Sequence, residues 1–140
     1  MRIIRTVIAG LLAVLLGLSA FAAAPVQADQ ALPKRTITEV PPDKEQQIDF
    51  NAFKLNGVVT ELQADGVTYL PYSGKVQLQK KACAKGCNWK TVKQVKTDAT
   101  GKYRTKIFVP QKGIWKWRVK VKASNGYGTT KGQVWTAAFE

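Results

Sequence analysis

Residues 115–122 carry the clearest structural signal in the chain, the sequence Trp115-Lys116-Trp117-Arg118-Val119-Lys120-Val121-Lys122. Side chains alternate across a β-strand, so the two Trp and two Val residues point one way and the four cations point the other. A period of two with one apolar side is typical of a strand that buries one face and exposes the other. The stretch therefore predicts a half-buried strand with a basic outer face.

The segment just before it, residues 102–109, repeats this arrangement, and Lys112-Gly113 supplies a turn between the two segments. We expect the two segments to pair as a hairpin, because sequential strands are usually neighbours. Such a hairpin would place seven cations on one sheet face with no acid between them: Lys102, Arg104, Lys106, Lys116, Arg118, Lys120 and Lys122.

This shared cationic face has two interpretations. Like charges directly opposite each other on neighbouring strands cost roughly 0.2–1 kcal/mol per pair, which solvent and salt partly screen. The face can therefore be a solvated, solubilising surface that also discourages edge-to-edge pairing. Alternatively it is an anion-binding face that holds a polymer or a surface by charge.

Further strands are predicted on both sides of these two segments. Apolar residues with a period near two mark residues 48–59, 74–79, 89–97 and 133–139, and the third of these is irregular enough to require a bulge or a bend. A turn signal over residues 98–101 separates the third from the segment that starts at residue 102. Short strands at roughly ten-residue spacing predict an all-β, Ig-like antiparallel β-sandwich of about seven strands, spanning residues 48–140 as a single domain.

Residues 29–47 are polar and contain Pro33 and the pair Pro41-Pro42. Proline lacks a backbone donor and biases the preceding residue towards extended conformations. We therefore expect an extended polar arm or linker here, with a short strand near Thr36–Val40 as the alternative.

The first 28 residues have the pattern of a secretory signal peptide. Arg2 and Arg5 precede an apolar run over residues 7–24, and Val26-Gln27-Ala28 places small residues at the positions before cleavage. The alternative is a permanent membrane anchor. We expect cleavage after Ala28 and secretion, with no transmembrane segment in the mature chain, because no later apolar run approaches the ~20 residues that a spanning helix needs.

The chain of 140 residues carries 22 Lys and Arg against 9 Asp and Glu, a formal net charge of +13. Most of this charge lies in residues 71–140, where sixteen cations face only two acids. Such asymmetry predicts an anionic partner, either a polymer or a cell-envelope surface. Nucleic acid is disfavoured, because the chain is expected to be exported and shows no nucleic-acid-binding motif.

Cys83 and Cys87 are the only two cysteines. In an oxidising compartment we expect them to form a disulfide that closes a hairpin tip, with Gly86 allowing the chain to turn back. A zinc site would need two further ligands, and the chain has no histidine. The alternative function is a secreted inhibitor or effector that presents the loop of residues 83–87, with Lys85 near its tip, to a partner protein.

Catalysis is hard to support with this inventory of side chains. Histidine, the commonest general base, is absent, and no cofactor or metal is expected. A carboxylate site built from Asp49, Glu61 or Asp65 is the alternative, although nothing in the sequence brings these residues together. We therefore predict that the chain is not an enzyme.

Residues from about 57 to 135 resemble the small bacterial immunoglobulin-like or transthyretin-like β-sandwich modules of exported proteins. The resemblance depends on the motifs Gly57-Val58-Val59, Gly74-Lys75-Val76-Gln77-Leu78-Gln79, Trp89-Lys90-Thr91-Val92, Thr97-Asp98-Ala99-Thr100-Gly101-Lys102-Tyr103 and Trp117-Arg118-Val119. It implies a non-catalytic binding, adhesion or spacer module with no active site.

Overall fold

The computed structural model describes residues 31–83, 85–110 and 112–139. This part of the chain is all-β, with ten strands in two antiparallel five-stranded sheets and no α-helix. Within these ranges no helix is long and apolar enough to cross a membrane. The predicted signal peptide of residues 1–28 lies outside the described residues.

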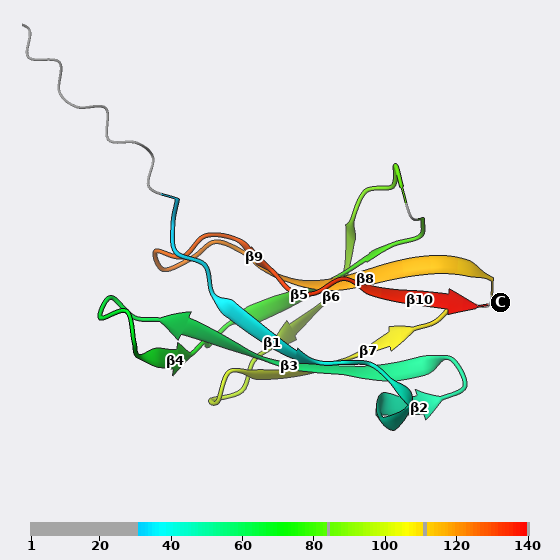
Figure 1. The fold of residues 1–140 in the computed structure, drawn as a ribbon, viewed down its shortest axis with the longest axis horizontal. Helices are drawn as coiled ribbons and strands as arrows, with labels where there is room; N and C mark the ends of the chain where they lie inside the picture. The colour runs from blue at the N-terminus through cyan, green and yellow to red at the C-terminus, as the bar shows by residue number, and fades with distance from the viewer. Residues whose placement is uncertain (1–30, 84, 111, 140) are drawn as a thin grey trace, which may run out of the picture. The chain divides into compact units, whose positions relative to one another are not determined.

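The first sheet, called sheet 1, contains β1 (Thr36–Val40), β2 (Gln47–Asp49), β3 (Ala52–Leu62), β4 (Tyr69–Pro71) and β7 (Lys102–Phe108). The second, sheet 2, contains β5 (Lys75–Lys81), β6 (Lys90–Lys96), β8 (Gly113–Val121), β9 (Thr130–Lys131) and β10 (Trp135–Phe139). A short 3-10 helix, η1 (Lys44–Gln46), connects β1 to β2. Figure 1 shows the sheets as two layers, with β1–β4 in one and β8–β10 in the other.

Each sheet is organised around one long strand. In sheet 1, β3 pairs with β1 and β2 along one edge and with β7 and β4 along the other. In sheet 2, β8 pairs with β5 on one edge and with β10 and β9 on the other, and β6 lies outside β5. The register of the β5–β6 pair shifts between Leu78 and Gln79 of β5. This shift confirms the bulge predicted for the irregular segment of residues 89–97, which forms β6.

The core lies between the sheets and is built from the apolar side of the alternating strands. Sheet 1 contributes Leu55 and Val59 from β3, and sheet 2 contributes Val119 and Val121 from β8, all fully buried. Trp117 is also buried, and Trp115 packs against this cluster with its ring edge-on to that of Trp117 at 6.2 Å. The two-residue period therefore identified the inward-facing apolar residues of β5, β7 and β8 correctly.

The predicted hairpin of residues 102–109 and 115–122 is wrong. The first segment is β7, which pairs with β3 in sheet 1, and the second is β8, which pairs with β5 and β10 in sheet 2. A strand with one apolar side can meet another strand either side by side or face to face across a core, and both arrangements bury that side. The eleven-residue β3 offers a long edge to β7, so the two basic segments face each other across the core through their apolar sides.

The N-terminal part of the predicted arm also differs from the expectation of an extended linker. Residues 36–40 form β1 and pair residue for residue with β3, which confirms the alternative of a short strand there. Arg35, just before β1, is only 3% exposed. Residues 31–140 cluster as one compact unit, so the domain begins well before residue 48.

The turn after β6 follows its sequence signal closely. Asp98 accepts hydrogen bonds from the hydroxyl of Thr100 at 2.7 Å and from the backbone N–H groups of Thr100 and Lys102 at 2.8 and 3.0 Å, and these bonds hold the pKa of its carboxyl below its usual 3.8. Gly101 has a φ of +76°, a conformation that residues with a side chain rarely adopt. This turn carries the chain from sheet 2 to sheet 1.

Candidate functional site

The outward side of sheet 2 gathers the largest group of cations. Lys116, Arg118 and Lys120 alternate along β8 with buried residues, so they point away from the core. Their neighbours in register on β5, β6 and β9 point the same way. We call this surface the sheet 2 face, and its cations are Lys75, Lys81, Lys96, Lys116, Arg118, Lys120 and Lys131.

Several of these cations are paired across strands with each other. The directly opposite residues are Lys75 with Lys96, Lys81 with Lys116, and Lys120 with Lys131. The outward positions of the sheet 2 strands, as far as they are described, hold no Asp or Glu. Each such like-charge pair destabilises the fold by roughly 0.2–1 kcal/mol, and an anion bound between the two side chains would remove that cost.

Arg118 is held rigidly near the middle of this face. Its Nε donates to Oε1 of Gln79 at 2.9 Å, and Nε2 of Gln79 donates to Oγ1 of Thr91 at 3.3 Å. The guanidinium lies 4.1 Å from the ring centre of Trp89, and Nζ of Lys81 lies 5.4 Å from the same ring. This arrangement presents a preorganised cation beside an aromatic ring.

Partial burial strengthens the field of this arginine. Removal from water lowers the pKa of Arg118 below its usual range, but a guanidinium stays charged at neutral pH. Gln77 and Gln79 beneath the cations are buried, although they are polar and point outward. A less hydrated cation interacts more strongly with a bound anion than a fully solvated one does.

The seven cations predicted for one face are divided between two. Lys116, Arg118 and Lys120 belong to the sheet 2 face, and the exposed Lys122 directly follows β8. The other three point outward from β7 on sheet 1, because they alternate with buried residues: Lys102, Arg104 and Lys106. The prediction of a single face is therefore wrong, since its members lie on the outer sides of two sheets that pack together through their inner sides.

The disulfide between Cys83 and Cys87 is present, as predicted, and closes the β5–β6 connection with the two Cα atoms 5.9 Å apart. Gly86 has a φ of +77°, which fits the expected turn. Lys85 and Gly86 are exposed. The bond thus closes a loop whose tip is accessible to a partner.

An ion pair missed by the sequence analysis anchors the N-terminal strand. Nε of Arg35 lies 2.8 Å from Oε1 of Glu61, and the other guanidinium nitrogens donate to the carbonyl oxygens of Lys122 and Ser124 at 3.1 and 2.9 Å. The guanidinium also lies over the rings of Tyr72 and Tyr127, at 4.4 and 5.0 Å from their centres. This cluster ties β1 to β3 and to the segment after β8.

Glu39 makes a second connection between the sheets. Its carboxylate accepts from the hydroxyl of Tyr103 at 2.7 Å and from the backbone N–H of Gln133 at 2.9 Å. Burial raises the pKa of Glu39 above its usual 4.5 in spite of these hydrogen bonds. Burial and the neighbouring carboxylate likewise raise the pKa of Tyr103.

The carboxylates considered for catalysis have separate local contacts. Glu61 pairs with Arg35, Asp49 accepts from the N–H of Phe50 at 2.7 Å, and Asp65 accepts from the N–H groups of the turn that follows it. Among the described residues no group of three or more His, Cys, Asp or Glu side chains is placed to hold a metal ion.

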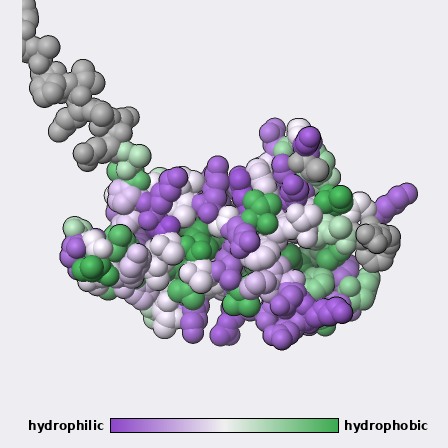
Figure 2. Space-filling model, viewed as in Figure 1, coloured by the Kyte–Doolittle hydropathy of each residue, from purple (hydrophilic) through white to green (hydrophobic). Residues whose placement is uncertain are grey.

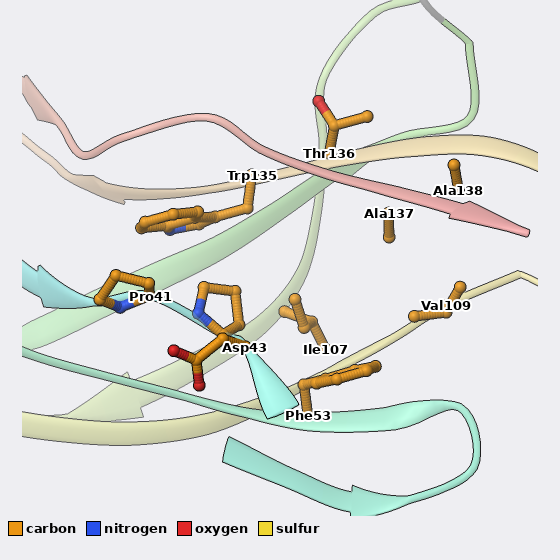
Figure 3. A pocket seen from close by; sticks show the side chains of 10 residues that line it. Pro41, Asp43, Phe53, Ile107, Val109, Trp135, Thr136, Ala137 and Ala138 are labelled. Carbon is orange, nitrogen blue, oxygen red and sulfur yellow. The ribbon is translucent and has the colours of Figure 1, made fainter. Parts of the chain in front are cut away.

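An apolar opening of about 370 Å³ lies at the seam between the sheets. Figure 3 shows Trp135 from β10 above it, with Phe53 and Ile107 below. Asp43 is the one charged residue in its lining as described. The opening offers mainly apolar contact area with a single carboxylate and no cation in its lining as described, so it does not share the chemistry of the basic faces.

Compared with known proteins, the chain matches no family model, no curated protein and no solved structure. The resemblance to immunoglobulin-like or transthyretin-like modules therefore stays a prediction from short motifs. Function has to be argued from the site itself.

Proposed function

We propose that this protein is a non-catalytic module that binds an anionic polymer or an anionic surface through the sheet 2 face. The observation that supports it best is a set of seven cations on one face, without an acid at the outward positions described. Like charges directly opposite each other cost folding stability, and a bound anion would recover that cost. A polyanion would neutralise these pairs along its length.

Binding of this kind depends on charge more than on a pocket. Each Lys or Arg that neutralises an anionic group releases a condensed counterion, so affinity falls steeply as the salt concentration rises. Arg118 would give a fixed point of contact, because Gln79 and Trp89 already hold its side chain. The lysines around it would adapt to the spacing of the anionic groups.

We also infer the setting in which this module works. The order of charge, apolar run and small residues over positions 1–28 supports export and cleavage after Ala28, and a disulfide persists in an oxidising compartment. The two antiparallel sheets and their shared core support an Ig-like β-sandwich. The natural ligand would then be a cell-envelope or extracellular polymer. Determining the amino terminus of the mature protein, which we expect at Asp29, tests the export step.

Retention on immobilised heparin, a sulfated polysaccharide, tests the binding proposal. The variant Lys116→Gln/Arg118→Gln/Lys120→Gln removes three cations from the sheet 2 face. A control, Lys34→Gln/Lys44→Gln/Lys112→Gln, removes the same charge from exposed positions elsewhere. We expect the first variant to elute at a much lower salt concentration than wild type, and the control to elute close to it.

Equal elution of the two variants would contradict a localised binding face, because the retention would then depend on net charge alone. Urea unfolding of each variant checks that loss of retention does not come from loss of structure.

The exposed disulfide loop supports a second candidate, an inhibitor or effector that binds a partner protein through residues 83–87. Lys85→Ala distinguishes the two functions. The substitution should leave heparin retention unchanged. It should abolish inhibition or binding of the partner protein only if the loop is the recognition element.

A further inference from the structure

We propose that the outer side of sheet 1 carries a second, independent anion site, and that the protein can therefore bridge two polyanion chains. The site is a hollow of about 600 Å³ at the β7 edge of sheet 1. Its lining contains four cations and two amide side chains: Lys54, Lys93, Arg104, Lys106, Gln46 and Asn56. The bridging part of this inference rests on the proposed function of the sheet 2 face.

The register of the strands explains why the hollow is so basic. Lys54 on β3 lies directly opposite Lys106 on β7, and Arg104 lies opposite Asn56 on the same two strands. Opposite residues in an antiparallel pair have Cβ atoms about 4.5–5.5 Å apart. Lys93 completes the lining from β6 of the other sheet. Thus one concave site draws cations from three strands.

The hollow also supplies hydrogen-bonding groups of fixed position. Nδ2 of Asn56 donates to Oε1 of Gln46 at 3.2 Å, which orients both amides. Thr105 also contributes to the lining, and its buried hydroxyl has no hydrogen-bond partner within the described ranges. No Asp or Glu contributes to the lining as described. Sulfate, phosphate or carboxylate groups fit this chemistry, and the volume allows a unit of one or two sugars rather than a single ion.

The two basic sites are centred on the outer sides of different sheets, although the hollow extends around the β7 edge to Lys93 of β6. Both sheets pack together through their inner sides, so their outer sides face away from each other. Figure 2 shows hydrophilic side chains projecting from both margins of the two layers, with hydrophobic side chains between them. The hollow shares no residue with the sheet 2 face. The central cations of the two sites, Lys54 with Lys106 and Arg118 with its neighbours on β8, lie on the outer sides of different sheets, so a short anionic chain held by one set would not reach the other.

The stoichiometry of a short ligand tests this inference. Calorimetric titration with a heparin tetrasaccharide should give two sites per wild-type protein. Lys54→Gln/Lys106→Gln should leave one, and so should Lys116→Gln/Arg118→Gln/Lys120→Gln. A control with two cations removed outside both sites, Lys44→Gln/Lys112→Gln, should keep two. Replacing opposed lysines relieves repulsion, so the hollow variant should fold, and its urea midpoint verifies this.

Bridging itself is measured with long heparin chains. Wild type should produce turbidity that peaks at an intermediate ratio of polymer to protein and disappears in polymer excess. Each single-face variant should bind without turbidity. A single tetrasaccharide site in wild type, or two sites left in the Lys54→Gln/Lys106→Gln variant, would overturn the second site but leave the proposed function standing. No binding to wild type would overturn both.

Discussion

Replacement of Arg35 by methionine is the sharpest test of how the two sheets are held together. The side chain of Arg35 is fully buried, and that of Glu61, its partner at 2.8 Å, is 17% exposed. Methionine has a similar length and fills much of the space but has no charge and no donor. The substitution leaves the Glu61 carboxylate without its cation and removes the donors to two backbone carbonyl groups.

The expected loss of unfolding free energy is about 3–5 kcal/mol, the range typical of a buried ion pair broken on one side. The partial exposure of Glu61 and the apolar contacts of methionine favour the lower half of this range. For a domain whose total stability is about 5–15 kcal/mol, this is a large share.

Urea unfolding followed by tryptophan fluorescence gives the comparison, with Lys34→Met as the control because Lys34 is the exposed neighbour of Arg35. The control should change stability by less than about 0.5 kcal/mol, as surface substitutions usually do. Glu61→Gln added to Arg35→Met should restore part of the loss, because it removes the unpaired charge. A loss below about 1 kcal/mol for Arg35→Met, or no recovery in the double variant, would refute this account of the ion pair.

Three further predictions concern other parts of the fold. Burial raises the pKa of Glu39 above 4.5, so the stability that its protonated carboxyl contributes is fully present below pH 4.5 and is lost as the pH rises through the raised pKa. Glu39→Gln should therefore flatten this part of the pH–stability curve, measured by urea unfolding. Gly101→Ala should destabilise more than Gly66→Ala in thermal unfolding, because both have a positive φ but only at Gly101 would a Cβ collide with a β3 carbonyl oxygen. Replacing Cys83 and Cys87 by serine should cost about 2 kcal/mol by the loop-entropy relation and leave heparin affinity within twofold of wild type.

The sequence predicted the longer strands and the inner faces of β7 and β8, but it predicted about seven strands where the described residues form ten, because it missed β4, β9 and the break between β2 and β3. An alternation of apolar and polar residues requires only that one side of a strand be buried, and this local condition held for Tyr103 in β7 and for Trp117 in β8. The partner of each strand could not be read from the same pattern. Whether β7 meets β8 side by side or across the core depends on β3, which lies about fifty residues earlier in the chain.

The same limit explains what was missed at the candidate sites. Arg35 looks like one cation in a polar stretch, and its partner Glu61 lies 26 residues away. The sheet 2 face left a partial signal in the sequence, because Lys75 begins an alternation of polar residues with Val76 and Leu78 in β5, as the cations of β8 alternate with Val119 and Val121. The hollow on sheet 1 requires the pairing of β3 with β7, and the incorrect hairpin excluded it.

The salt dependence of heparin affinity tests the central claim most directly. Affinity is measured by fluorescence titration of wild type, the sheet 2 face variant Lys116→Gln/Arg118→Gln/Lys120→Gln and the control Lys34→Gln/Lys44→Gln/Lys112→Gln over a series of salt concentrations. The slope of log K against log salt reports the number of ion contacts released on binding. We predict a steep slope for wild type and the control and a clearly shallower one for the sheet 2 face variant. Equal slopes for all three proteins, or an affinity that does not change with salt, would contradict binding through this face.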